Sequence, residues 1–251
     1  MNEYGTVDEQ KTIKSSPEFH ELMKKVCEKM NISLNTLVDQ EGNKAEIAGC
    51  VEIKGIKGTD NRCYFVDLQG MTPRDANYLG DSNHTALIRQ ELLVMYQRYR
   101  SLEHAKEKMV SFEKEVDEER NGKYPKPEEG KDLTEEQKKE VDKITQEYSI
   151  KKIRQFEAFM KETEPLQFNA NVFKKVNIDL SKEELAAEEE KVKNLAVYLK
   201  EQAIPNLIKN MQKNEGIPTD SKSLSDFMHQ NGVNMRYMGY IAEQIKDKNL
   251  S

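Results

Sequence analysis

The sequence predicts an α+β chain: a small antiparallel β-sheet with a helix in the N-terminal third, then a mostly helical region with a protruding charged helical hairpin. Three observations support this fold class. β-Branched runs alternate with turn residues between positions 36 and 68, apolar residues recur at helical spacing elsewhere, and charged residues make up 33% of the 251 residues. We expect three parts, at residues 1–100, 101–164 and 165–251, of which the second is the charged hairpin arm.

The first predicted helix covers residues 17–30. Pro17 follows Ser16, and a proline in the first turn of a helix loses no hydrogen bond that the helix needs. The apolar residues of its buried face are Phe19, Leu22, Met23, Val26 and Met30. After Thr36, the runs TLVD, KAEIAG, CVEIKGI and RCYFVDL predict an antiparallel meander, with a tight turn at residues 57–61.

Two long helices are predicted to form the charged hairpin. Residues 83–116 have a helical composition, and the stretch at 117–131 combines charge, glycine and two prolines, which favours an exposed loop. Thr134 and Gln137 have the spacing of a capping box, so a second helix should begin there and run back along the first. The hairpin should span residues 84–163.

The C-terminal region is predicted to be helical. Ser181 and Glu184 form a second capping-box pattern, and Pro205 should interrupt or restart the helix that follows. A last helical pair is indicated by Ser223 and Asp226 as start signals and by Gly232 as the stop between its two helices.

Composition argues against several classes of protein. The net charge of −6 is not that of a protein that binds nucleic acid over its whole surface. No long apolar run or signal-like N-terminus is present, so we expect a cytoplasmic chain without a membrane span. Three widely spaced cysteines and four scattered histidines match no metal motif, so we expect no metal site and no cofactor.

Several stretches, taken together and in this order, resemble the clustered mitochondria (CLU) family. They are YGTVDEQKTIKSSPEFHELMKK, VEIKGIKGTDNRCYFVDLQGMTPRDANYL, RQELL, FNANVF and MHQNGVNMRYMG. The resemblance covers the later half of the family's central Clu domain, here residues 1–100, and the region after it. The chain is therefore expected to be a fragment or truncated copy of a larger protein.

The resemblance implies a non-catalytic cytoplasmic factor that is required for normal mitochondrial distribution. It also implies association with mRNAs for mitochondrial proteins and with the ribosome or translation initiation factors, besides protein partners. Two alternatives stay open: a protein-interaction adaptor that makes no RNA contact, and an enzyme of an unrecognised kind.

Six residues are candidate contacts for RNA or a partner. Lys54, Lys57, Arg62, Tyr64 and Arg74 lie around the predicted turn, and Arg236 lies in the last resemblance stretch. The simpler interpretation is a solvated hairpin whose aromatic side chains enter the core. No catalytic residues are proposed: Asp75, beside Asp67 and Asp81, is expected to order a turn rather than to act as an acid or base.

Overall fold

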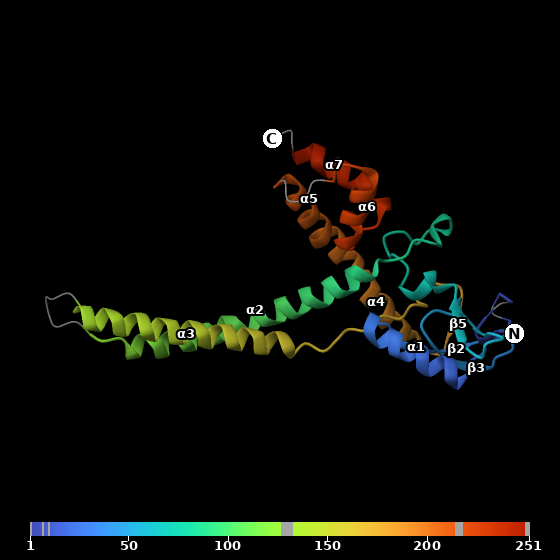
Figure 1. Ribbon diagram of the computed structural model, residues 1–251, viewed down its shortest axis with the longest axis horizontal. Coiled ribbons are helices and arrows are strands. Elements are labelled where there is room, and N and C mark those ends of the chain that lie inside the picture. The colour runs from blue at the N-terminus through green and yellow to red at the C-terminus, as the bar shows by residue number, and fades with distance from the viewer. Residues whose placement is uncertain (1, 7, 10, 127–132, 214–217, 249–251) are drawn as a thin grey trace. The chain divides into compact units, whose positions relative to one another are not determined.

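The computed structural model describes residues 2–6, 8–9, 11–126, 133–213 and 218–248 of the chain. Contacts divide the chain into two compact units, a globular unit of residues 1–96 and 166–251 and an arm of residues 97–165. Both are visible in Figure 1. The predicted α+β class is confirmed, whereas the division at 1–100, 101–164 and 165–251 stays a prediction.

The globular unit contains two three-stranded antiparallel sheets rather than one meander. The first has the order β1 (Asn2–Gly5), β4 (Lys54–Lys57) and β5 (Cys63–Val66). The second has the order β3 (Lys44–Ala48), β2 (Leu34–Val38) and β6 (Asn177–Ile178). The chain leaves the second sheet after β3 because Gly49 has φ +95° and the next turn buries Val51 and Ile53. Sequence patterns missed β1 and β6.

Helix α1 (Pro17–Met30) has the predicted bounds and packs against strands of both sheets, β1 of the first and β3 of the second. Its buried residues Phe19, Met23 and Cys27 follow one another at intervals of four, which places them on one stripe of the helix. The Phe19 ring lies 5.3 Å from the Phe65 ring of β5, centroid to centroid, in an edge-to-face contact. Asn31 ends the helix in the left-handed conformation.

The helices after residue 180 follow most of the predicted signals. They are α4 (Lys182–Tyr198), a π-helical turn (Leu199–Ala203), α5 (Ile204–Gln212), α6 (Ser221–Gln230), the 3₁₀ turn η4 (Met235–Tyr237) and α7 (Met238–Lys248). Ser181 and Glu184 form the predicted capping box, and the helix restarts beside Pro205. Gly232 follows the end of α6 with φ +71°.

The predicted start of α6 was wrong. Asp220 and not Ser223 is the N-cap, because the Asp220 carboxylate accepts the backbone N–H of Ser223 at 2.7 Å. Ser223 occupies the third position of the same capping box, so the helix begins one turn earlier than its serine suggested.

The arm consists of the part of α2 (Gln90–Lys123) after residue 96 and of α3 (Glu135–Lys161), which run side by side (Figure 1). The Thr134–Gln137 capping box is confirmed. The start of α2 at 83 was wrong, because residues 81–83 form the short 3₁₀ turn η2 (Asp81–Asn83). The loop at 117–131 was placed too early, since α2 continues to Lys123, and residues 127–131 of it lie outside the described residues.

A narrow seam holds the arm together. Ala105, Met109, Val116 and Tyr148 are buried. Ala105, Met109, Phe112 and Val116 alternate in steps of four and three, the spacing of a coiled-coil interface. Outside the seam, Lys152 pairs with Asp117 at 2.9 Å, and Lys151 pairs with Glu119 at 2.7 Å.

Candidate functional site

The β4–β5 hairpin carries four of the six candidate contact residues. Its turn is closed by the Gly58 N–H, which donates to the Arg62 carbonyl at 2.9 Å. The Tyr64 hydroxyl donates to the Asp60 carboxylate at 2.7 Å and so fixes the same turn. The predicted turn between the two strands is confirmed.

Each cation of this hairpin has a carboxylate partner. Lys54 pairs with Asp67, Lys57 pairs with Glu18 of α1 at 2.8 Å, and Arg62 pairs with Asp60 at 3.7 Å. The hydrogen bond from Lys57 lowers the pKa of Glu18, so that carboxylate stays charged at neutral pH. The three cations of the hairpin are therefore balanced by three carboxylates, two of the hairpin itself and one of α1.

The two aromatic residues of β5 face opposite sides of the sheet. Phe65 packs against Phe19 below α1, as the simpler interpretation of the hairpin expects. Tyr64 is 47% exposed, beside Ile56 at 37% and Val66 at 42%. These three residues lie on one face of the β4–β5 pair, because Ile56 is directly opposite Tyr64 and Val66 is two residues along. We call them the outer sheet face.

Arg74 lies apart from the hairpin, between the 3₁₀ turn η1 (Leu68–Met71) and η2. Its guanidinium donates to the carbonyl of Phe173 at 2.8 Å and to those of Gly80 and Asn83 at 3.4 Å each. It forms no ion pair with any carboxylate in the described part of the chain. In this respect it differs from the other cationic candidates.

Asp75 and Arg236 belong to a buried polar network. The Asp75 carboxylate is 1% exposed, and it accepts the Tyr237 hydroxyl at 2.8 Å and the Arg236 guanidinium at 3.3 Å. It also accepts the backbone N–H of Asn77 at 3.0 Å, which confirms that Asp75 orders a turn. Burial and the Asp75 charge raise the pKa of Tyr237, so the hydroxyl stays protonated and donates.

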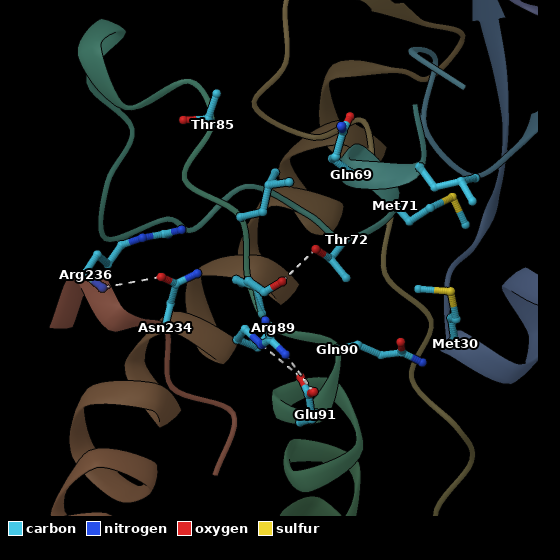
Figure 2. Close-up of a pocket in the computed structure, with 13 residues that line it drawn as sticks. Met30, Gln69, Met71, Thr72, Thr85, Arg89, Gln90, Glu91, Asn234 and Arg236 are labelled. Atoms are coloured by element: carbon cyan, nitrogen blue, oxygen red, sulfur yellow. Dashed lines mark hydrogen bonds and ion pairs between the residues drawn. The ribbon is translucent and has the colours of Figure 1, made fainter. Parts of the chain in front are cut away.

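A pocket of about 370 Å³ opens beside this network (Figure 2). It is lined by Met30, Leu68, Gln69, Met71, Thr72, Thr85, Leu87, Ile88, Arg89, Gln90, Glu91, Asn234 and Arg236. Arg89 holds Glu91 through two hydrogen bonds, at 2.8 and 3.1 Å. Burial raises the pKa of Glu91, but these bonds outweigh it and lower the pKa below its usual range. Glu91 is therefore a charged carboxylate that is already bound by Arg89, and it is a poor proton donor.

The pocket is lined largely by hydrogen-bonding groups. Its lining contains amides, hydroxyls and two paired arginines, and it lacks a nucleophile next to a base. Across the described ranges, no group of three or more His, Cys, Asp or Glu side chains is placed to hold a metal ion. The three cysteines are free thiols, and burial raises the pKa of Cys27 and of Cys50 to about 12.

The structure does not bring the six candidate residues together. Lys54, Lys57, Arg62 and Tyr64 share the hairpin, Arg74 lies among backbone carbonyls, and Arg236 lines the pocket. Sequence reasoning missed Asn171, which is fully buried and bonds the Val51 N–H and the Gly49 carbonyl, both at 2.9 Å. Its signal was the FNANVF stretch, in which two asparagines alternate with apolar residues.

Comparison with known protein families defines the class of the chain. The family described as clustered mitochondria matches residues 1–78, and the family described as translation initiation factor eIF3 subunit 135 matches residues 215–251. Asp75 lies in the first match, and Arg236 and Tyr237 lie in the second. The buried network therefore joins the two matched segments into one structure.

Individual relatives carry the clustered mitochondria name. The chain is 32% identical to the Clustered mitochondria protein of Arabidopsis thaliana over 97% of its own length, which is 18% of that relative. It is 30% identical to the homologue of Dictyostelium discoideum over 93% of the chain and 16% of the relative. It is 31% identical to the Coccidioides immitis homologue over 98% of the chain and 20% of the relative. The resemblance to the clustered mitochondria family is confirmed.

The chain spans about a fifth of the length of these relatives. No solved structure matches it. Among the described residues, no helix is both long and apolar enough to cross a membrane. The matched relatives are named as clustered mitochondria proteins and not as a known enzyme family.

Proposed function

We propose that this chain is a non-catalytic interaction segment of a cytoplasmic factor that maintains the distribution of mitochondria. The observation that carries the proposal is its similarity, over nearly its whole length, to proteins named for clustered mitochondria. Association with mRNAs for mitochondrial proteins and with translation machinery is part of the proposal. The match of residues 215–251 to a translation initiation factor subunit supports the link with translation.

The hairpin favours a second candidate function, protein contact without RNA. RNA binding draws on cations that neutralise phosphates, and the hairpin cations are each neutralised by a carboxylate of this chain. The outer sheet face leaves three apolar side chains exposed on one surface, which is the composition of a protein contact rather than of an RNA contact.

Loss of the protein in its own cells tests the first proposal. Disruption of the gene should collapse mitochondria into clusters, and re-expression of the intact protein should restore their distribution. Ultraviolet cross-linking in the same cells should recover mRNAs for mitochondrial proteins in excess over control transcripts. Unchanged mitochondria after disruption would contradict the role in distribution. An absence of cross-linked mRNA would contradict RNA association and favour an adaptor that contacts only proteins.

Variants of the hairpin separate the two functions. Lys57→Glu and Arg62→Glu should abolish cross-linking if the hairpin holds RNA, and should leave it unchanged if the paired cations are structural. Tyr64→Ser and Val66→Ser should release bound proteins if the outer sheet face is a protein contact. Val94→Ser is the matched control, because Val94 is 55% exposed on α2 and lies outside that face.

A further inference from the structure

Two adjoining cavities of the globular unit share residues Glu52, His84 and Lys174. The first has a volume of about 340 Å³ and is also lined by Arg74, Asp81 and Lys175. The second has a volume of about 520 Å³ and is also lined by Asp67, Gln69, Gly70, Thr85 and Leu87. We call the two cavities together the Lys174 cleft.

Arg74 gives this cleft a positive charge that lacks a neutralising partner among the described carboxylates. Three backbone carbonyls hold the guanidinium, and its Nε atom is buried without a hydrogen-bond partner. Carbonyl groups orient a guanidinium through their dipoles but carry no net charge, so the full charge of Arg74 remains for an anion. Phe173, which supplies the nearest of these carbonyls, has the left-handed φ of +63°.

Two consecutive lysines follow Phe173 and line the first cavity. The Lys174 side chain is only 8% exposed, and its ammonium donates to the Glu52 carboxylate at 2.8 Å and to the Gly70 carbonyl at 3.0 Å. Lys175 is exposed and forms no ion pair with a described acid. Lys174 is thus a fixed part of the wall, and Lys175 is a second cation available to a ligand.

The charges of the cleft favour an anionic ligand. Glu52 is paired with Lys174, and Asp67 is paired with Lys54, so neither acid opposes a ligand with its full charge. Asp81 is left as the one described lining carboxylate that faces the charges of Arg74 and Lys175. Two uncompensated cations against one carboxylate distinguish this cleft from the neutral hairpin.

We propose that the Lys174 cleft binds a phosphate group, either as a free phosphate or as the backbone phosphate of an RNA strand. A phosphate offers several acceptor oxygens and matches a guanidinium and an ammonium that approach it together. The RNA form of the proposal rests on the proposed association with mRNA, whereas the phosphate form does not.

Binding to the intact chain tests the proposal with two probes, inorganic phosphate and single-stranded oligouridine, at low and high salt. Lys175→Gln should weaken binding of either ligand roughly fivefold, as expected for one exposed charge contact. Asp81→Asn should strengthen binding by a similar factor, because it removes the opposing charge. Lys25→Gln is the matched control: Lys25 is an exposed lysine of α1, which lines neither cavity.

The results separate this proposal from the general one. Phosphate that binds and competes with oligouridine identifies the cleft as the RNA contact. Phosphate that binds while oligouridine does not supports the cleft and argues against RNA. If oligouridine binds and Lys175→Gln and Asp81→Asn change its binding no more than Lys25→Gln does, the proposed phosphate site is wrong. The proposed association with RNA is then still supported. If neither probe binds, the proposed phosphate site is wrong as well.

Discussion

The globular unit and the arm use the same chemical group in opposite ways. In the globular unit the Asp75 carboxylate is 1% exposed and accepts hydrogen bonds from a tyrosine, an arginine and a backbone amide. In the arm the Glu119 carboxylate, 47% exposed, accepts from Lys151, Lys123 and Tyr148 on the helix surface. Both are well partnered, so the difference between them isolates the effect of burial.

Burial decides what each group contributes to stability. A buried carboxylate has lost its water, so its protein partners are all that stabilises the charge, and removing the group leaves those partners unsatisfied. An exposed carboxylate regains water when its partners are removed. The stability of the globular unit should therefore depend strongly on the network around Asp75. The stability of the arm should depend mainly on its apolar seam, with a smaller contribution from its surface charges.

The largest effect is expected for Asp75→Ala. The substitution strands the Tyr237 hydroxyl and the Arg236 guanidinium, and should lower the free energy of unfolding by about 3–5 kcal/mol. Urea unfolding followed by circular dichroism measures the change. Asp75→Asn, which keeps an acceptor but loses the charge, should be milder. A loss below about 1 kcal/mol for the alanine variant would mean that the network is not coupled to folding.

A buried amide gives the next effect. Asn171→Ala should lower the free energy of unfolding by about 2–3 kcal/mol, because it leaves the Val51 N–H and the Gly49 carbonyl without their side-chain partner at a fully buried position. Gln40→Ala is the control, since the Gln40 side chain is exposed and donates to a surface carbonyl. Equal unfolding midpoints for the two variants would show that water replaces the Asn171 side chain.

Tyr237→Phe should have a smaller effect than either. It removes the hydroxyl but keeps the ring and leaves Asp75 with Arg236 and the Asn77 amide, so we expect a loss of about 1–2 kcal/mol. Tyr240→Phe, on a half-exposed ring three residues further along the chain, controls for the loss of a hydroxyl. A loss as large as that of Asp75→Ala would indicate that the hydroxyl alone organises the network.

Sequence reasoning predicted the local features and missed the long-range ones. The helix at residues 17–30, the turn at 57–61 and two capping boxes depend on residues within one turn of each other, and all are present. The division into two sheets depends on β1 pairing with β4, where Asn2 faces Ile56, and on β6 pairing with β2, where Ile178 faces Leu37 from more than a hundred residues away. No local pattern contains that information.

The candidate site shows the same limit. Charge and position along the chain suggested that Lys54, Lys57 and Arg62 were free to bind a ligand. Lys57 instead pairs with Glu18, which depends on where α1 packs, and the other two pair with Asp67 and Asp60. The charge of Arg74 stays unpaired because Phe173, ninety-nine residues away, supplies a carbonyl instead of a carboxylate. Residue type indicated which side chains were cationic, and only the fold shows which of them remain available.

The smallest effect, and the one that depends on pH, is expected in the arm. Hydrogen bonds from Lys151, Tyr148 and Lys123 lower the pKa of Glu119 to about 2, against about 4.3 in an unfolded chain. Because its pKa is lower in the folded arm, the ionised Glu119 stabilises the fold at pH values above the unfolded-state pKa. This contribution is lost as the pH falls toward 2. Hydrogen-exchange protection of α3 should therefore decrease between about pH 5 and pH 3, after correction for intrinsic exchange rates. Glu119→Gln removes this contribution, so protection near pH 7 should fall toward the level that the intact protein has at about pH 3, and protection should vary less with pH. An unaltered pH dependence in that variant would assign it to the other acids of the arm.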